Sequence, residues 1–149
     1  MAAKLALTLI ALSPMFALAF SQAQSSKIIG SWRVEIMFGN GVTHTLRLEA
    51  RDSGKGSFQL VDARSKVWGF SKPSEAKWTE GNQGSVTFSG PVEFPLGNIG
   101  RDAGTLVLKG EFGTEGAITG EAEFFPIGQE PKDAKPSKSG AFKAVRVTG

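Results

Sequence analysis

The stretch "GSWRVEIMF", residues 30–38, decides the fold. Arg33 and Glu35 stand between apolar neighbours. Because successive side chains of a β-strand point to opposite faces, this spacing predicts a strand with one buried and one solvated face. The apolar residues at alternate positions are Trp32, Val34, Ile36 and Phe38.

The same alternation continues along the chain and predicts antiparallel hairpins. "GNG" at 39–41 is a turn signal, because glycine and asparagine tolerate positive φ, and it leads into "VTHTLRLEA" at 42–50. A third strand is expected in "SFQLVD", residues 57–62. A second hairpin is expected from "GTLVLKGEF" and "AITGEAEFF". The strand "GAFKAVRVTG" closes the chain.

The middle of the chain is less regular. "KVWGFS" and "EAKWTE" are each expected to form a short strand, separated by Lys72-Pro73. "SVTFSGPVEF" is either one long strand bent at Gly90-Pro91 or two strands. "PLGNIGRDAG", residues 95–104, is expected to be a loop. The proline-rich and charged segment 126–138 predicts an exposed, mobile loop.

These segments amount to about eight strands and no long helix, which predicts an all-β fold. Glycines inside expected strands, at 90, 110 and 120, favour a coiled sheet over a flat one. We therefore expect an antiparallel up-and-down barrel of about eight strands, whose closure removes exposed strand edges. A β-sandwich is the alternative.

Residues 1–23 read as a signal peptide, with Lys4 as the basic start, an apolar run and a small-residue cleavage site. We expect cleavage after Ala23, with Ala19 as the rival position. A membrane anchor is the competing interpretation, but the apolar run is shorter than the roughly 20 residues that span a bilayer. The chain has no cysteine, which excludes a lipoprotein. We expect an exported protein, periplasmic or secreted.

Residues 24–149 have the length of a single β-barrel domain. The formal net charge of the chain is +3, with acidic and basic residues mixed along it. This small surplus gives no reason to expect binding to nucleic acid. No membrane span is expected once the signal peptide has been removed, and no protein partner is indicated.

The two ends of this domain carry a family resemblance. Gly30-Ser31-Trp32 resembles the G-x-W opening of the lipocalins and their calycin relatives, which are up-and-down barrels. In that family an arginine on the last strand packs over the opening tryptophan and closes one end of the barrel. Arg146 is the matching position. The chain has no tyrosine, so the resemblance implies the fold and the closure by Trp32 and Arg146, and no specific ligand.

Residues that commonly carry chemistry are scarce. His44 is the only histidine, which excludes histidine-cluster metal sites, and its place near a turn suggests a residue of the barrel rim. No nucleophile elbow or phosphate-binding glycine motif occurs. The acids Glu111, Glu121 and Glu123 are expected to face solvent. Asp52 and Asp102 are expected in loops, but neither stretch matches an EF-hand loop for Ca²⁺. We expect no catalytic residue, no metal site and no cofactor.

The aromatic residues suggest either a filled barrel or a cavity for a ligand. We expect most of them to fill the core. Trp68 and Trp78 are the exceptions, because they fall in the irregular middle where a barrel mouth is expected. The leading hypothesis is an exported, non-enzymatic barrel that binds a small apolar ligand through Trp68, Phe70 and Trp78. A filled barrel acting as a structural or protein-interaction domain of the envelope, and a cofactor-free isomerase or hydrolase, are the alternatives.

Overall fold

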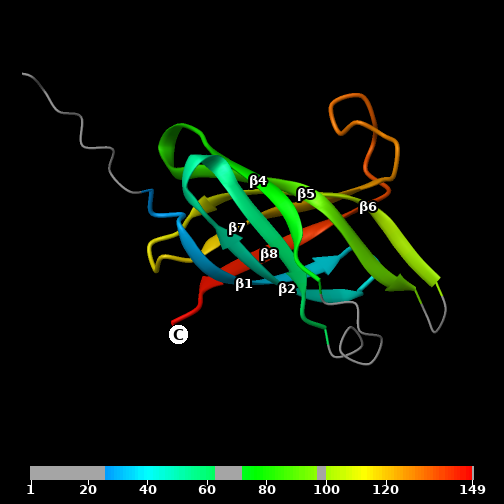
Figure 1. Ribbon diagram of the computed structural model, residues 1–149, viewed down its shortest axis with the longest axis horizontal. Helices are drawn as coiled ribbons and strands as arrows, with labels where there is room; N and C mark the ends of the chain where they lie inside the picture. The colour runs from blue at the N-terminus through cyan, green and yellow to red at the C-terminus, as the bar shows by residue number, and fades with distance from the viewer. Residues whose placement is uncertain (1–25, 63–71, 97–99, 149) are drawn as a thin grey trace, which may run out of the picture.

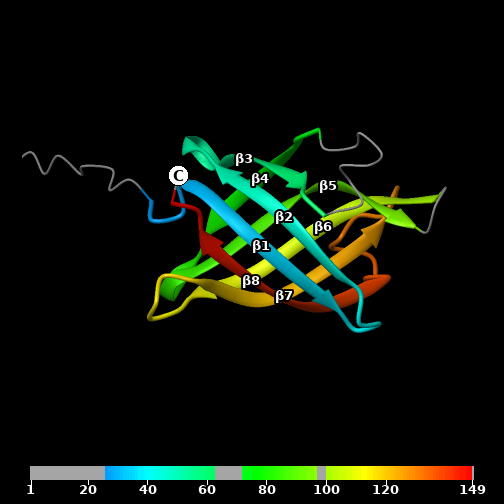
Figure 2. The same cartoon turned by 90° about the horizontal axis from the view of Figure 1, so that it is seen from below.

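The protein forms a closed antiparallel β-barrel in a computed structural model that describes residues 26–62, 72–96 and 100–148 (Figures 1 and 2). Each strand pairs with the next in sequence, and β1 also pairs with β8. The expected up-and-down barrel is confirmed, and the sandwich alternative is wrong. The strands are β1 Gly30–Phe38, β2 Thr43–Ala50, β3 Lys55–Leu60, β4 Ser74–Glu80, β5 Ser85–Leu96, β6 Gly100–Phe112, β7 Ile118–Pro126 and β8 Lys138–Arg146.

Strand β1 shows why the sequence closes in this way. Its burial alternates along the strand, and the buried residues from Trp32 to Phe38 face the barrel interior. They join one hydrophobic cluster that draws residues from all eight strands of the described chain. Each fully buried aliphatic or aromatic side chain contributes about 1.5–3 kcal/mol relative to an exposed one. The alternating stretch therefore supplies one wall of the core.

Glycine allows the barrel wall to coil between β6 and β7. Gly110 and Gly120 face one another in the register of these two strands. A Cβ atom on Gly120 would lie only 1.9 Å from the carbonyl oxygen of Lys109. No other residue fits there without moving the backbone, which accounts for glycine at position 120 inside a strand.

The barrel has two ends that the chain builds differently. We call the end where β1 begins the tryptophan end, after Trp32, and the opposite end the histidine end, after His44 near the start of β2. Figure 2 shows the C-terminus beside the start of β1, at the tryptophan end. The odd-numbered strands begin at the tryptophan end and run to the histidine end, and the even-numbered strands return.

The irregular middle of the sequence is more ordered than expected. "EAKWTE" lies in β4, and residues 85–96 form one strand that continues through Gly90-Pro91. The loop expected at 95–104 is wrong, because β5 reaches Leu96 and β6 begins at Gly100. Pairing runs without interruption from Leu96↔Gly100 to Ser85↔Glu111, so both prolines of this stretch are held within a long ribbon. "KVWGFS" lies outside the described residues.

The β7–β8 connection lies between Pro126 and Lys138 and has no strand of its own. Most of its residues are exposed. The backbone N–H of Ser137 donates to the carbonyl oxygen of Phe124 at 2.8 Å, and that of Gln129 donates to Pro126 at 3.2 Å. These bonds tie both ends of the connection to β7.

Across the described ranges, no helix is long and apolar enough to cross a membrane.

Candidate binding site at the histidine end

The tryptophan end is closed by Trp32 and Arg146, which are directly opposite one another on β1 and β8. The guanidinium carbon of Arg146 lies 4.4 Å from the centroid of the Trp32 ring. Arg146 also donates to the carbonyl oxygens of Ile29, at 2.9 Å, and of Lys27. The indole Nε1 of Trp32 donates to Ile28 at 2.8 Å. The segment before β1 is thus fastened across this end of the barrel.

Trp78 also lies toward the tryptophan end. Its Nε1 donates to the carbonyl oxygens of Arg51 and Lys55, each at 2.8 Å, and its side chain is only 9% exposed. Trp78 is therefore held at the tryptophan end. Trp68 and Phe70 lie outside the described residues, and ligand contact by Trp68, Phe70 and Trp78 remains a prediction.

His44 is the central polar residue of the histidine end. It is 7% exposed, and its Nδ1 lies 2.6 Å from Oδ2 of Asp62. The other carboxylate oxygen of Asp62 accepts the backbone N–H of Thr45 at 2.5 Å. Because an ionised carboxylate only accepts hydrogen bonds, the proton of this contact is assigned to Nδ1 of His44. The imidazole is thus held in one orientation by a carboxylate that the backbone also fixes.

The sequence analysis missed Asp62 as the partner of His44, although a signal was present. Leu46 and Leu60 are directly paired in the β2–β3 register. His44 precedes Leu46 by two residues and Asp62 follows Leu60 by two, so both side chains are on the inward face beyond the last pair. An inward acid beside an inward histidine on adjacent strands predicts this contact.

Three phenylalanine rings fill the barrel axis beneath His44. The imidazole stacks on Phe94 with centroids 4.2 Å apart and planes at 23°. Phe94 in turn contacts Phe38 at 5.8 Å and Phe124 at 5.4 Å between centroids. All three phenylalanines are buried. The barrel axis is therefore closed at this end by packed aromatic rings.

An ion pair of Lys138 and Asp102 lies on the other side of these rings. Lys138 Nζ contacts Oδ2 of Asp102, and it lies 5.5 Å from the centroid of Phe124. Asp102 is directly opposite Phe94 in the β5–β6 register. The expected placement of Asp102 in a loop is wrong, because Asp102 is within β6 and its carboxylate pairs with a lysine.

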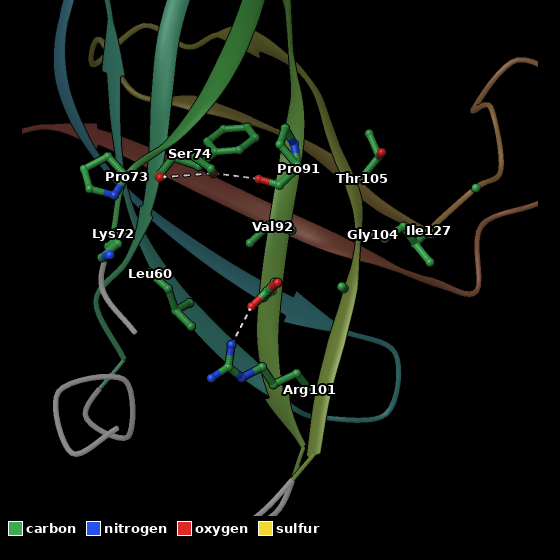
Figure 3. Close-up of a pocket in the computed structure, with 14 residues that line it drawn as sticks. Leu60, Lys72, Pro73, Ser74, Pro91, Val92, Arg101, Gly104, Thr105 and Ile127 are labelled. Carbon is green, nitrogen blue, oxygen red and sulfur yellow. Dashed lines mark hydrogen bonds and ion pairs between the residues drawn. The ribbon is translucent and has the colours of Figure 1, made fainter. Parts of the chain in front are cut away.

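A pocket of about 640 Å³ opens in the side of the barrel at the histidine end (Figure 3). β4 pairs with β5 only from Lys77↔Ser89 to Glu80↔Val86, so β5 has no strand partner on that side further toward the histidine end within the described residues. The Ser74 hydroxyl spans the gap and donates to the carbonyl oxygen of Pro91 at 2.7 Å. The pocket begins where these two strands separate.

The pocket walls come from several elements. Leu60 and the residues from Lys72 to Ser74 form one wall, and Ile127 with Gly128 forms the other. Residues of β5 and β6 lie between them, including Val92, Glu93, Arg101, Ala103 and Thr105. Arg101 Nη1 donates to Oε2 of Glu93 at 3.1 Å. The site combines apolar surface with a small number of charged and hydroxyl groups.

The carboxylates considered for catalysis do not converge. Glu111 and Glu121 are exposed, and Glu123 pairs with Lys109 at 3.2 Å. In the part of the chain that the structure describes, no three histidine, aspartate or glutamate side chains are grouped so as to hold a metal ion.

Comparison of the chain with protein-family models, with curated proteins and with solved structures finds no significant match.

Proposed function

We propose that this chain is an exported, lipocalin-like and non-enzymatic barrel that binds a small, mainly apolar molecule in the pocket at the histidine end. The observation that carries the proposal is the volume of that pocket, about 640 Å³. Small-molecule sites typically measure about 300–1,000 Å³ and combine apolar walls with a few polar groups. The basic and apolar pattern of residues 1–23 supports export.

The proposed site lies in the barrel wall because the axis is occupied at both ends. Trp32 at the tryptophan end and Phe94 at the histidine end are each 0% exposed. A ligand on the axis would have to displace these rings, whereas the side pocket requires no such rearrangement. Leu60, Val92 and Ile127 supply its apolar contacts.

The strand edge beside the pocket favours a small molecule over an extended peptide. Pro91 turns its carbonyl oxygen toward Ser74, and N–H and C=O of one residue share a side of an antiparallel strand. The edge positions of β5 are therefore Pro91, Glu93 and Pro95. Two of these three have no N–H, so an added strand would find few donors.

A protein-interaction role is the second candidate, and one observation favours it. Four exposed apolar side chains lie around the histidine end. Surface apolar groups that gather in one region mark interaction sites more often than scattered ones. The four residues are Met37, Val42, Leu96 and Ile127.

The binding proposal can be tested with a neutral solvatochromic dye, Nile red. Ala103→Trp fills part of the pocket, so we expect it to weaken dye binding at least about tenfold, the effect of about 1.4 kcal/mol. Lys143→Trp, on the exposed face of β8, is the matched control and should bind as the unmodified protein does. Fluorescence titration measures both, and far-UV circular dichroism checks that each variant is folded.

Two results would overturn the proposal: no dye binding to the unmodified protein, or equal binding by Ala103→Trp. The double variant Met37→Ser with Val42→Ser distinguishes the protein-interaction role from small-molecule binding. It changes the β1–β2 hairpin outside the pocket lining. The small-molecule proposal expects this double variant to keep full dye binding.

A further inference from the structure

We infer that the side pocket selects an apolar molecule that carries an anionic group, and that Lys72 and Arg101 provide this selectivity. The inference rests on the proposed function and narrows its ligand class. It comes first from the charged side chains that line the pocket, of which more are positive than negative. It comes also from the apolar surface that lies between these side chains and the opposite wall of the pocket.

Among the described residues that line the pocket, three are charged: Lys72, Arg101 and Glu93. Glu93 pairs with Arg101 at 3.1 Å, so these two charges largely compensate one another. Lys72 adds a further positive charge at the start of the β4 wall. The pocket lining therefore has a formal surplus of positive charge, which favours an anion.

Two other acids of the histidine end are already paired. The carboxylate of Asp102 is paired with Lys138, and that of Asp62 contacts His44 at 2.6 Å. Neither acid is among the described residues that line the pocket. Within this described lining, the excess charge is that of Lys72 beside the Arg101–Glu93 pair.

Arg101 adds geometric selectivity to this charge. A guanidinium group is a planar fork with five N–H donors that matches the two oxygens of a carboxylate or the oxygens of a sulfate. Glu93 accepts from Nη1 and so fixes the orientation of the fork at the pocket. The shared chemistry of the expected head group is a compact anion with two or more terminal oxygens.

The shape of the pocket accommodates an apolar body beside such a head group. Figure 3 shows Lys72 and Leu60 on one side of β5 and Ile127 on the other. Pro91 and Val92 of β5 lie between these walls and carry no charge. An elongated ligand can place its anion beside Lys72 or Arg101 and extend an alkyl chain across β5 toward Ile127.

The test compares three ligands that share a ten-carbon chain: decanoate, decanol and decylammonium, each titrated by Nile red displacement. We expect decanoate to bind most tightly and decylammonium least. Lys72→Gln should weaken decanoate binding about 1.5- to 5-fold, the range for an exposed charge pair, and leave decanol binding unchanged. Lys77→Gln, at an exposed lysine of β4 that does not line the pocket, is the matched control and should leave the binding of all three ligands unchanged.

Salt provides a second measurement. Raising NaCl from 0.02 to 0.5 M should weaken decanoate binding to the unmodified protein and change decanol binding little, because salt screens exposed charges. Decyl sulfate should follow decanoate if the fork accepts either anion.

The outcomes separate this inference from the proposed function. If decanol binds as tightly as decanoate and Lys72→Gln changes neither, the charge selectivity is wrong while the binding site stands. If none of the ten-carbon ligands displaces Nile red and the dye itself does not bind, the proposed function is wrong as well.

Discussion

The two ends of the barrel are closed by different kinds of contact. At the tryptophan end, Trp32, Trp78 and Arg146 donate to backbone carbonyl oxygens and pack on one another or on the core. At the histidine end, His44 and Lys138 contact carboxylates across the barrel mouth. Every residue has a backbone carbonyl oxygen, so this acceptor does not depend on the amino acid at that position. A carboxylate acceptor requires an aspartate or glutamate at one particular position. The tryptophan end therefore tolerates sequence change in its acceptors, and the histidine end does not.

The ends also differ in what lies beside them. The segment before β1 is drawn across the tryptophan end by the bonds to Lys27, Ile28 and Ile29. At the histidine end the β5–β6 ribbon projects beyond its neighbours (Figure 1), and the side pocket opens along its β5 edge. The contacts of the tryptophan end are thus made within the barrel and its preceding segment, whereas the proposed binding site lies beside the histidine end.

The largest expected effect is the loss of Trp32. Trp32→Ala should lower the free energy of unfolding by about 3–5 kcal/mol, because it leaves a large cavity under Arg146. Urea denaturation followed by circular dichroism measures the change. Val145→Ala, one residue from Arg146 and 48% exposed, is the control and should cost less than about 0.5 kcal/mol. A loss for Trp32→Ala no larger than that of the control would contradict a stabilising role for the tryptophan end.

The contact at the tryptophan end was predicted from two sources. Alternation in residues 30–38 assigns Trp32 to the interior, and the resemblance to the lipocalins implies that Arg146 of the last strand packs over it. Closure of an up-and-down barrel then makes the first and last strands neighbours. Trp78 was assigned to the mouth because the β4 boundaries were uncertain, and the direction of β4 decides which end its tryptophan reaches.

A smaller effect is expected from the pair of His44 and Asp62 at the histidine end. A double-mutant cycle with His44→Ala and Asp62→Ala should give a coupling energy of about 0.5–3 kcal/mol, the range for residues in one hydrogen-bonded network. The cycle cancels other contacts of Asp62, including the bond from the Thr45 N–H. A coupling energy of zero would show that Asp62 does not hold the imidazole.

The sequence could not supply the side pocket, for a physical reason. Its opening depends on where β4 and β5 stop pairing, and alternation gives the face of a residue without the length of a ladder. The wrong prediction of a loop at 95–104 has the same reason, because alternation does not show how far two strands stay paired. The glycines and the proline of "PLGNIGRDAG" are typical of loops, but they are also compatible with a two-stranded ribbon that has one free edge. Phe94 and Asp102 were therefore not recognised as facing neighbours.

The smallest effect is expected from the pair of Arg33 and Glu35 on the outer face of β1. This exposed pair serves as the reference for the coupling energy of His44 and Asp62. Their charged groups lie 3.4 Å apart, but the side chains are 64% and 65% exposed, against 9% and 17% for His44 and Asp62. Water and salt screen an exposed pair, so Arg33→Ala with Glu35→Ala should give a coupling energy below about 0.5 kcal/mol that disappears in 0.5 M NaCl. The coupling of His44 and Asp62 should persist in the same salt, because a partly buried hydrogen bond is screened much less than an exposed ion pair. Equal salt sensitivity of the two cycles would mean that the histidine end is as open to water as the outer face, and that the hydrogen bond of His44 and Asp62 contributes nothing to the closure.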